Sequence, residues 1–283
     1  MKTFARIGLI LALLVVFLAG SVRPAQAAIL DEDGKIEAGE VIDDDVFLSG
    51  EHVIVDGTVN GLLVAAGETV TINGVINGDA MLFGNTVIVS PQASINGNIF
   101  LGSRTGEIAG KISGSLLGGA ASVVLADTAL IERNLYFGGY SFQSESGSSI
   151  SRDLLMAGYQ GILGGEVQRD VYFGGGALEL TGQVGRNLQV EIGDMRAGFR
   201  PILFGQENLP PAVAPGLRIA ENASIGSKLV YTSPEPQSNT IHIEPAGGVV
   251  YQTPVPEEKQ TEAARPSSFT TRYPAARWFF DFI

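Results

Sequence analysis

The stretch GVINGDAML, residues 74–82, recurs with small changes through most of the chain, for example as GEVQRDVYF at residues 165–173. Each copy has a small residue, an apolar residue two positions later, Gly or Arg, then Asp or Asn, and three apolar residues. Successive copies start 17 or 19 residues apart, until a step of 41 residues leads to the last copy. The starts are Glu40, Gly57, Gly74, Ala93, Gly110, Ala129, Ser148, Gly165, Gly182 and Ala223. Repetition at a fixed period predicts a solenoid, in which stacked units bury the apolar face that a single unit cannot bury.

The units carry the pattern of β-strands. Apolar and polar residues alternate, as in the run from Thr69 to Ile72, and helical spacing is absent from residue 40 to residue 192. Pairs such as Asn60-Gly61 and Asn77-Gly78 favour tight corners. The sequence therefore predicts an all-β fold: a single-stranded β-helix solenoid with triangular coils of about 17–19 residues. At roughly 4.8 Å per coil, ten coils make a rod of about 48 Å.

The spacing of the coils is the evidence for the handedness of the β-helix. Left-handed β-helices use strict hexads, and residues 219–226 fit two of them. The other coils do not keep a spacing of six, since steps of 17 and 19 residues break it. We expect a right-handed helix, and the left-handed alternative stays open.

Composition narrows the classes of function. The chain has 283 residues and no cysteine, which excludes disulfides, thiolate nucleophiles and zinc–thiolate sites. Its formal net charge of −12 excludes nucleic-acid binding through bulk charge.

Residues 1–27 read as a secretory signal peptide, with Lys2 and Arg6 before an apolar run and a cleavage site at Ala25-Gln26-Ala27. The alternative is an uncleaved membrane anchor, although the 16 apolar residues from Ile7 to Val22 are short for a span. We expect an exported protein of the periplasm or the outer face of the cell envelope, with membrane association as an option.

The remaining chain divides by composition. We expect an acidic lead-in at 28–39, β-helix coils at 40–195, a Pro-rich excursion loop at 196–218, final coils at 219–243, and a disordered Pro/Glu-rich tail at 244–283. The tail ends in an aromatic segment that includes Trp278, Phe279 and Phe280 beside Arg277. Aromatic side chains next to arginine favour a membrane interface or a partner groove. The alternative is a chain end that packs on the rod.

The chain resembles the bactofilins, a family of polymer-forming bacterial cytoskeletal proteins, over residues 40–192. The matching stretches are GTVNG at residues 57–61, GVINGD at residues 74–79 and ASINGNI at residues 93–99. The resemblance implies right-handed β-helices that join end to end into filaments without a nucleotide, often at membranes, and position envelope enzymes. It implies no cofactor. Because family members are mostly cytoplasmic with short disordered ends, an exported relative describes this chain better.

Four successive units have arginine at their fifth position, each followed by Asp or Asn: Arg133, Arg152, Arg169 and Arg186, hereafter the arginine file. Equivalent positions of a β-helix stack at strand spacing, so four guanidinium groups in line repel one another unless they are paired. Asp153 and Asp170 can accept charge-assisted hydrogen bonds from them. The file predicts either a binding strip for carboxylate, sulfate or phosphate groups of an envelope polysaccharide, or a self-paired corner.

The middle residue of each apolar triplet predicts a second surface. Strand alternation turns the outer two residues of a triplet inward and the middle one outward. The outward residues, hereafter the apolar file, are Phe47, Val64, Met81, Phe100, Leu117, Tyr136, Leu155 and Tyr172. A contiguous apolar stripe marks an interaction surface, so we expect lateral packing against a second rod, a membrane or a partner. The alternative is cover by residues 199–217 and the tail of the same chain.

The chain offers little for catalysis or metal binding. Asp43-Asp44-Asp45 lacks the spacing of a calcium loop and favours a charged cap on the open sheet end. The two histidines, His52 and His242, have no supporting constellation for an acyltransferase base. We therefore predict a non-enzymatic scaffold that associates with itself through coil ends or the apolar file, without catalytic, cofactor or metal residues. The alternative function is a secreted binding module, meaning an adhesin or a binder of glycans and polyanions.

Overall fold

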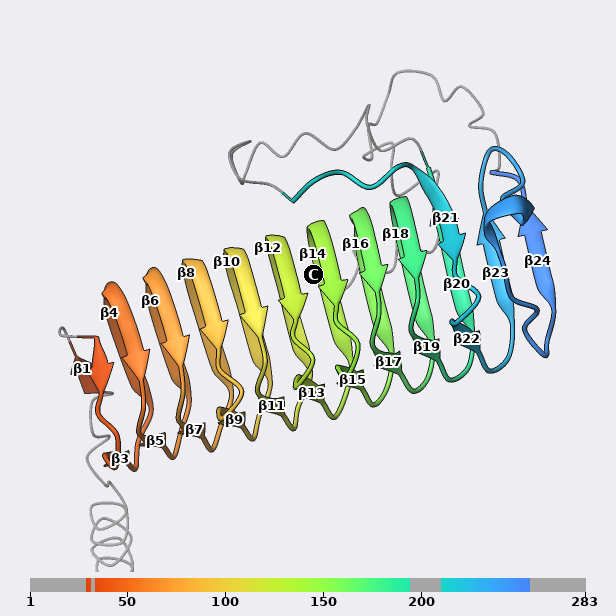
Figure 1. Cartoon of the computed structure of the whole chain (residues 1–283). Helices are drawn as coiled ribbons and strands as arrows, with labels where there is room; N and C mark the ends of the chain where they lie inside the picture. The colour runs from red at the N-terminus through yellow and green to blue at the C-terminus, as the bar shows by residue number, and fades with distance from the viewer. Residues whose placement is uncertain (1–28, 32–33, 194–209, 255–283) are drawn as a thin grey trace, which may run out of the picture.

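The computed structural model describes residues 29–31, 34–193 and 210–254, and it confirms the all-β solenoid. Figure 1 shows the coils stacked side by side in chain order from β1 to β24. Two parallel sheets run the length of the stack, one of 14 strands and one of 10 strands. Within the described residues, the 3-10 helix η2 (Ser238–Thr240) is the helical element, and no helix is long and apolar enough to cross a membrane.

The larger sheet is built mainly from eight strands of ten residues each. They are β4 (Val46–Val55), β6 (Leu63–Ile72), β8 (Ala80–Val89), β10 (Ile99–Ile108), β12 (Leu116–Leu125), β14 (Leu135–Ser144), β16 (Leu154–Leu163) and β18 (Val171–Leu180). Its end strands are β1 (Ile29–Asp31), β2 (Lys35–Ile36), β20 (Leu188–Ile192), β21 (Gly216–Ile219), β23 (Leu229–Thr232) and β24 (Val249–Gln252).

The smaller sheet consists of strands of two residues, one from each coil. They are β3 (Val41–Ile42), β5 (Thr58–Val59), β7 (Val75–Ile76), β9 (Ser94–Ile95), β11 (Lys111–Ile112), β13 (Leu130–Ile131), β15 (Ser149–Ile150), β17 (Glu166–Val167), β19 (Gln183–Val184) and β22 (Ser224–Ile225). The second residue of each short strand points into the core, and from β3 to β22 that residue is always Ile or Val.

Each long strand bends at its middle, which gives the coil three sides. In β6 the buried residues are Leu63 and Ala65, then Val70 and Ile72. Ala65 and Val70 are an odd number of residues apart, so a flat strand would send them to opposite faces. The pairing of β4 with β6 skips the sixth residue of each strand, at Glu68 in β6, where the backbone turns. The two halves of the long strand and the short strand are the sides of the predicted triangular coil.

The difference between 17- and 19-residue steps lies at one corner of the coil. Two residues join β6 to β7, whereas four residues join β8 to β9, and the longer connection closes a turn in which Ala93 N donates to Ser90 O at 2.9 Å. The strands on either side keep their register. The irregular period therefore leaves the core ladders intact.

Two predicted boundaries differ from the structure. The lead-in at 28–39 contains β1 and β2, which pair with β4 as a preceding coil. The predicted tail from 244 contains β24, which pairs with β23. The excursion interrupts a coil at its bend, because β20 pairs with the first half of β18 and β21 with the second half. The predicted signal peptide and the aromatic tail end lie outside the described residues.

Close approach of the coils dictates glycine at one corner. A Cβ atom added to Gly74 would lie 1.9 Å from the carbonyl oxygen of Gly57 in the preceding coil, which is far inside van der Waals contact. A Cβ atom on Gly119, in the bend region of β12, would meet its nearest atom, Gly138 O, at 3.4 Å. The same substitution should therefore have opposite outcomes at the two positions.

We predict that Gly74→Ala lowers stability by about 3 kcal/mol, the upper range for overpacking, because main chain must move apart from main chain. Gly119→Ala is the matched control and should change stability by less than about 1 kcal/mol. Urea unfolding followed by circular dichroism measures both. Equal midpoints for the two variants would contradict the close-packed corner.

Candidate binding surfaces

The apolar file lies in register along the larger sheet, at the second residue of each long strand. The pairings place Phe47, Val64, Met81, Phe100, Leu117, Tyr136, Leu155 and Tyr172 side by side in consecutive coils. Phe47 is 40% exposed and the others are half-buried, apart from Leu155, which is only 5% exposed and differs from the expectation. The line continues through Gln189 to Val230 and Val250.

Phe83 widens the apolar file and was missed by the sequence pattern. It lies two residues after Met81 on the same outward side of β8 and is 44% exposed. A Cβ atom on Gly102 of the next coil would lie 2.8 Å from the Phe83 ring, so the absence of a side chain there makes room for the ring. Extending the alternation by one more outward position would have identified it.

The other two outward faces of the coil are not uniformly apolar. The ninth residue of the long strands and the first residue of the short strands also point outward. The ninth residues from β4 to β18 are Ile54, Thr71, Ile88, Glu107, Val124, Gln143, Ile162 and Glu179. The first residues of the short strands include Thr58, Ser94, Lys111 and Glu166. Charged and polar side chains interrupt both faces, so the apolar file is a property of one face only.

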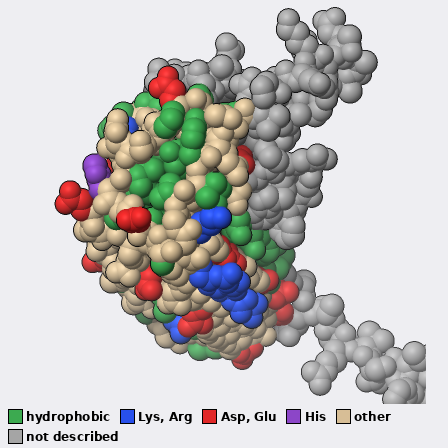
Figure 2. All heavy atoms as spheres, turned by 90° about the vertical axis from the view of Figure 1, so that its right-hand side faces the viewer, with side chains coloured by type: hydrophobic (Ala, Val, Ile, Leu, Met, Phe, Trp, Pro, Cys, Tyr) green, Lys and Arg blue, Asp and Glu red, His purple; other side chains and the backbone are tan. Residues whose placement is uncertain are grey.

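The arginine file is partly self-paired across neighbouring coils. Arg169 Nε lies 3.5 Å from Asp153 Oδ1, and an Arg186 terminal nitrogen lies 3.5 Å from Asp170 Oδ2. In both pairs the arginine comes from one coil and the carboxylate from the coil before it. Figure 2, a view from the β24 end, shows a strip of basic side chains with acidic side chains beside it. Arg133 and Arg152 are exposed, and within the described ranges no carboxylate lies at ion-pair distance from them.

The Asp and Asn residues at the sixth position of the repeat, some of which follow the arginines, have a structural role. Their Oδ1 atoms accept the main-chain N–H of the equivalent residue in the next coil. The pairs are Asp45 with Leu62, Asp79 with Asn98, Asn98 with Ser115, Asn134 with Asp153, Asp153 with Asp170, and Asp170 with Asn187, at 2.7 to 3.3 Å. This corner hydrogen-bond ladder accounts for the Asp or Asn in the repeat without any ligand.

The Asp43-Asp44-Asp45 run is engaged in the same kind of contact. Asp43 Oδ1 accepts from the side-chain amide of Asn60, and Asp44 Oδ1 accepts from Asp45 N at 2.8 Å. A cluster of three potential metal ligands is not found among the residues that the structure describes. The run borders β3, the terminal strand of the smaller sheet.

The structure does not bring the two histidines together. His52 is on β4 near one end of the solenoid, with Nε2 3.9 Å from a Glu51 carboxylate oxygen, and His242 follows the bridge to Ile219 near the other end. Trp278, Phe279 and Phe280, predicted to contact a membrane or partner, lie outside the described residues.

The end of the stack at β24 also presents apolar side chains. Val249 is 42% exposed, and Ile241, Ile243 and Tyr251 are partly buried against the core. Apolar side chains gather on this end in Figure 2. This end is therefore a second apolar surface beside the apolar file.

A further contact was not indicated by the sequence pattern. Residues 210–215 cross the bend of the long strands and bond to Tyr159 and Gln160 of β16. Together with the first three residues of β21, this segment is the described part of the excursion loop predicted at 196–218. It bonds at the sixth and seventh residues of the strand, away from the second residue that forms the apolar file. The described excursion residues thus bond to a different line of the coil.

Comparisons with models of known protein families, with curated proteins and with solved structures returned no match.

We predict that Asp170 holds the corner mainly through the main chain. Asp170→Ala should lower stability by about 2 kcal/mol, because it leaves the part-buried main-chain N–H and side-chain amide of Asn187 without their acceptor. Asp170→Asn should cost less than about 1 kcal/mol, because an amide oxygen still accepts that hydrogen bond, as Asn98 and Asn134 do elsewhere in the ladder.

The matched control for charge is Arg186→Ala, which removes the half-exposed guanidinium that pairs with Asp170 at 3.5 Å and should cost less than about 1 kcal/mol. Urea midpoints of the three variants rank the contributions. If Arg186→Ala were as costly as Asp170→Ala, the ion pair and not the main-chain hydrogen bond would hold the corner.

Proposed function

We propose that this chain is a non-enzymatic structural rod of the cell envelope that associates side by side with a second copy through the apolar file. The observation that carries the proposal is the contrast between the faces. One outward line is apolar in every coil from Phe47 to Tyr172, whereas the other two outward lines carry charges. A second copy has the same spacing between coils, so it can match the file residue for residue.

The energetics require several coils to engage together. Burying an apolar side chain fully stabilises by about 1.5–3 kcal/mol, and residues that are already half-buried have roughly 1 kcal/mol left to gain. Association costs at least about 4 kcal/mol in lost freedom of motion. A contact over two or three coils therefore gives no stable pair, whereas a contact over the whole file does. A long stack of similar coils meets that requirement.

Two sequence features support the envelope part of the proposal. The signal-like residues 1–27 favour export, and the likeness of residues 40–192 to bactofilins favours polymer formation by a β-helix. The apolar β24 end offers end-to-end growth as a second mode, which is the mode that the bactofilin likeness favours.

The alternative function is a binding module for polyanions. The observation in its favour is the pair of exposed arginines, Arg133 and Arg152, which have no carboxylate at ion-pair distance within the described part of the chain. Their guanidinium groups would bind sulfate, phosphate or carboxylate groups of an envelope glycan. Arg169 and Arg186 are less available, because Asp153 and Asp170 pair with them.

We predict that the double variant Met81→Glu with Phe100→Glu abolishes self-association, because it places two charges in the centre of the file. The matched control is Ile88→Glu with Val124→Glu, two half-buried outward residues at the ninth position of nearby strands. Light scattering across protein concentration and negative-stain electron microscopy measure association, and thermal unfolding checks the fold. Equal loss of association in both variants would contradict the assignment to this face.

The dependence of binding on salt concentration distinguishes the two proposed functions. Oligomers held by the apolar file should persist from about 50 mM to 500 mM salt and strengthen in sulfate, because apolar burial is not screened. Binding of heparin as a model polyanion to Arg133 and Arg152 should weaken steeply over the same range. A rod that is monodisperse at every concentration, but binds heparin with a steep salt dependence, would replace the scaffold by the binding module.

A further inference from the structure

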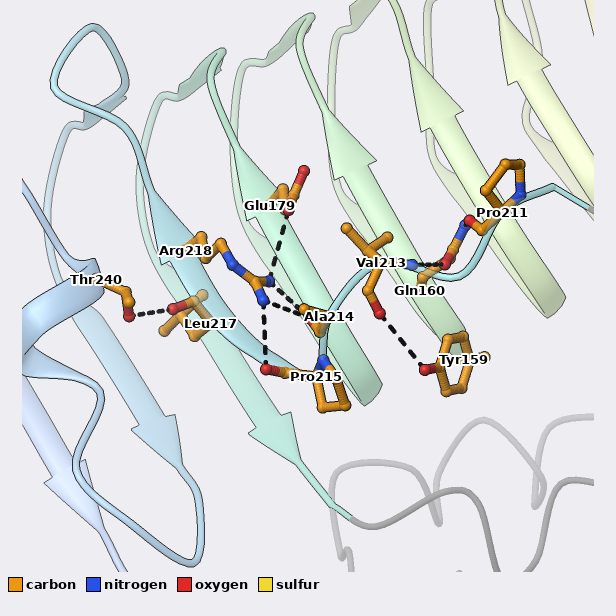
Figure 3. Close-up of polar contacts among 10 residues, drawn as sticks. All are labelled: Tyr159, Gln160, Glu179, Pro211, Val213, Ala214, Pro215, Leu217, Arg218 and Thr240. Carbon is orange, nitrogen blue, oxygen red and sulfur yellow. Dashed lines mark hydrogen bonds and ion pairs between the residues drawn. The ribbon is translucent and has the colours of Figure 1, made fainter.

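Residues 210–215, with the sequence PPAVAP, lie across the long strands where these bend, and we call them the strap (Figure 3). The strap is anchored at one end by β21, which begins at Gly216. Arg218 fixes the same end, since its guanidinium donates to Ala214 O at 2.6 and 2.7 Å and lies 3.5 Å from Glu179. From there the strap runs back over β16, two coils nearer the N-terminus in the larger sheet.

Gln160 binds the strap as another peptide group would. Its Nε2 donates to Pro211 O at 3.1 Å, and its Oε1 accepts from Val213 N at 2.8 Å. Nε2 also donates to Ser141 Oγ at 3.1 Å, so the amide of this 1% exposed side chain is fully hydrogen-bonded. A buried amide without these partners would cost about 1–3 kcal/mol. Gln160 therefore requires an extended chain, or water in its place, to occupy the bend.

Two stacked tyrosines lie next to Gln160 at the bend of the strands. Tyr159 Oη donates to Val213 O at 3.4 Å, and its ring stacks on Tyr140 with centroids 5.1 Å apart and planes 5° from parallel. A Cβ atom on Gly176 would lie 3.2 Å from the Tyr159 ring, so glycine in the next coil makes room for it. Burial raises the pKa of the Tyr140 hydroxyl, and its neighbour Tyr159 adds to the shift. We call Tyr140, Ser141, Tyr159 and Gln160 the tyrosine groove.

The tyrosine groove recognises the main chain of the strap more than its side chains. All three bonds from Tyr159 and Gln160 go to main-chain atoms of Pro211 and Val213. The side chains of Pro211, Ala212, Ala214 and Pro215 are exposed, and Val213 is half-buried. Proline suits this recognition, because its fixed φ holds the chain extended with free carbonyl groups at a low entropic cost. Aromatic hydroxyls and amides that bond to carbonyls are the usual chemistry of grooves for proline-rich peptides.

We propose that the tyrosine groove is a binding site for an extended, proline-rich peptide segment of a partner protein, and that the strap occupies it in cis. These hydrogen bonds do not require the strap to belong to the same chain, because they involve main-chain atoms that any such peptide has. A tethered occupant acts at an effective concentration of about millimolar, so a free peptide enters only when it is abundant, multivalent or when the strap is released. The groove would give the rod a docking point that the strap keeps closed.

The experiment uses the full chain with Val213→Pro, which removes the N–H that Gln160 accepts and should release the strap. The probe is a fluorescein-labelled peptide, LPPAVAPG, with the sequence of residues 209–216. Fluorescence anisotropy should show saturable binding to the Val213→Pro chain at least tenfold tighter than to the wild-type chain. Binding should fall at least tenfold when Gln160→Leu is added, and a control peptide with proline in place of valine should not bind.

Hydrogen exchange keeps the proposal falsifiable. If the Gln160 side-chain amide, which donates to Pro211 O in the wild-type chain, loses its protection from exchange in Val213→Pro while the peptide fails to bind, the groove serves only its own chain and the proposal is wrong. A second measurement does not need the variant: millimolar peptide should speed exchange of Val213 N–H in the wild-type chain by displacing the strap. Unchanged exchange at saturating peptide would also overturn the proposal.

The outcome is independent of self-association. The tyrosine groove uses sixth and seventh residues of the long strands, whereas the apolar file uses second residues. The double variant Met81→Glu with Phe100→Glu should bind the peptide as its parent does. Monodisperse rods that bind the peptide would therefore refute the proposed lateral association and leave the peptide site standing.

Discussion

Parallel stacking of coils in register is the constraint on which the rest of this molecule depends. Each residue of a coil lies beside its equivalents in the coils before and after, at roughly the 4.8 Å spacing of paired strands. A side chain at one position therefore contacts the side chains at the same position of the neighbouring coils. Apolar residues profit from this arrangement, as the column of Ile and Val in the short strands does. Stacked charges of one sign repel each other, and side chains at a tight corner clash. The sequence avoids each of these problems in a different way.

The Asp and Asn corner shows how polar positions stay compatible with stacking. An oxygen of one coil accepts from the main chain of the next, so the contact is between unlike groups even where the side chains are alike. The arginines follow the same offset, because Arg169 and Arg186 each reach back to a carboxylate of the preceding coil. In the earlier coils an amide ladder serves, with Asn77 donating to Asn60 and Asn96 donating to Asn77. Equivalent polar residues can thus stack where each has both a hydrogen-bond donor and an acceptor. They can also stack where a carboxylate of the neighbouring coil lies beside each arginine.

The sequence was sufficient for the features that repeat. Period, alternation and Asn-Gly corners predicted the all-β solenoid, the inward residues and the line of the apolar file, because each coil gives the same information again. It was insufficient where a contact occurs once. Gln160 and Val213 are 53 residues apart and belong to no repeat, so no local pattern joins them. Leu155 is 5% exposed at an outward position where Tyr136 and Tyr172 are half-buried, and the repeat pattern does not distinguish the three. The end strands β1, β2 and β24 escaped prediction because terminal coils depart from the motif that defines the inner ones.

The position of the excursion loop relates the repeated features of the coils to the contacts that occur only once. A long insertion in a solenoid breaks a coil, and the cost is least where the main chain makes no ladder bond. The bend of the long strands is such a place, since the pairing skips the sixth residue there. The chain leaves after β20 and returns at β21, and both halves still pair with β18, so the stack continues without a gap in register. The same bend is where alternation lapses, and in β18 it contains Gly174, Gly175 and Gly176, of which Gly176 lies against the Tyr159 ring of the preceding coil. An insertion that starts at the bend is thus delivered to the line of the coil that contains Tyr159 and Gln160. This placement explains physically why the strap, and no other described segment, lies on the tyrosine groove.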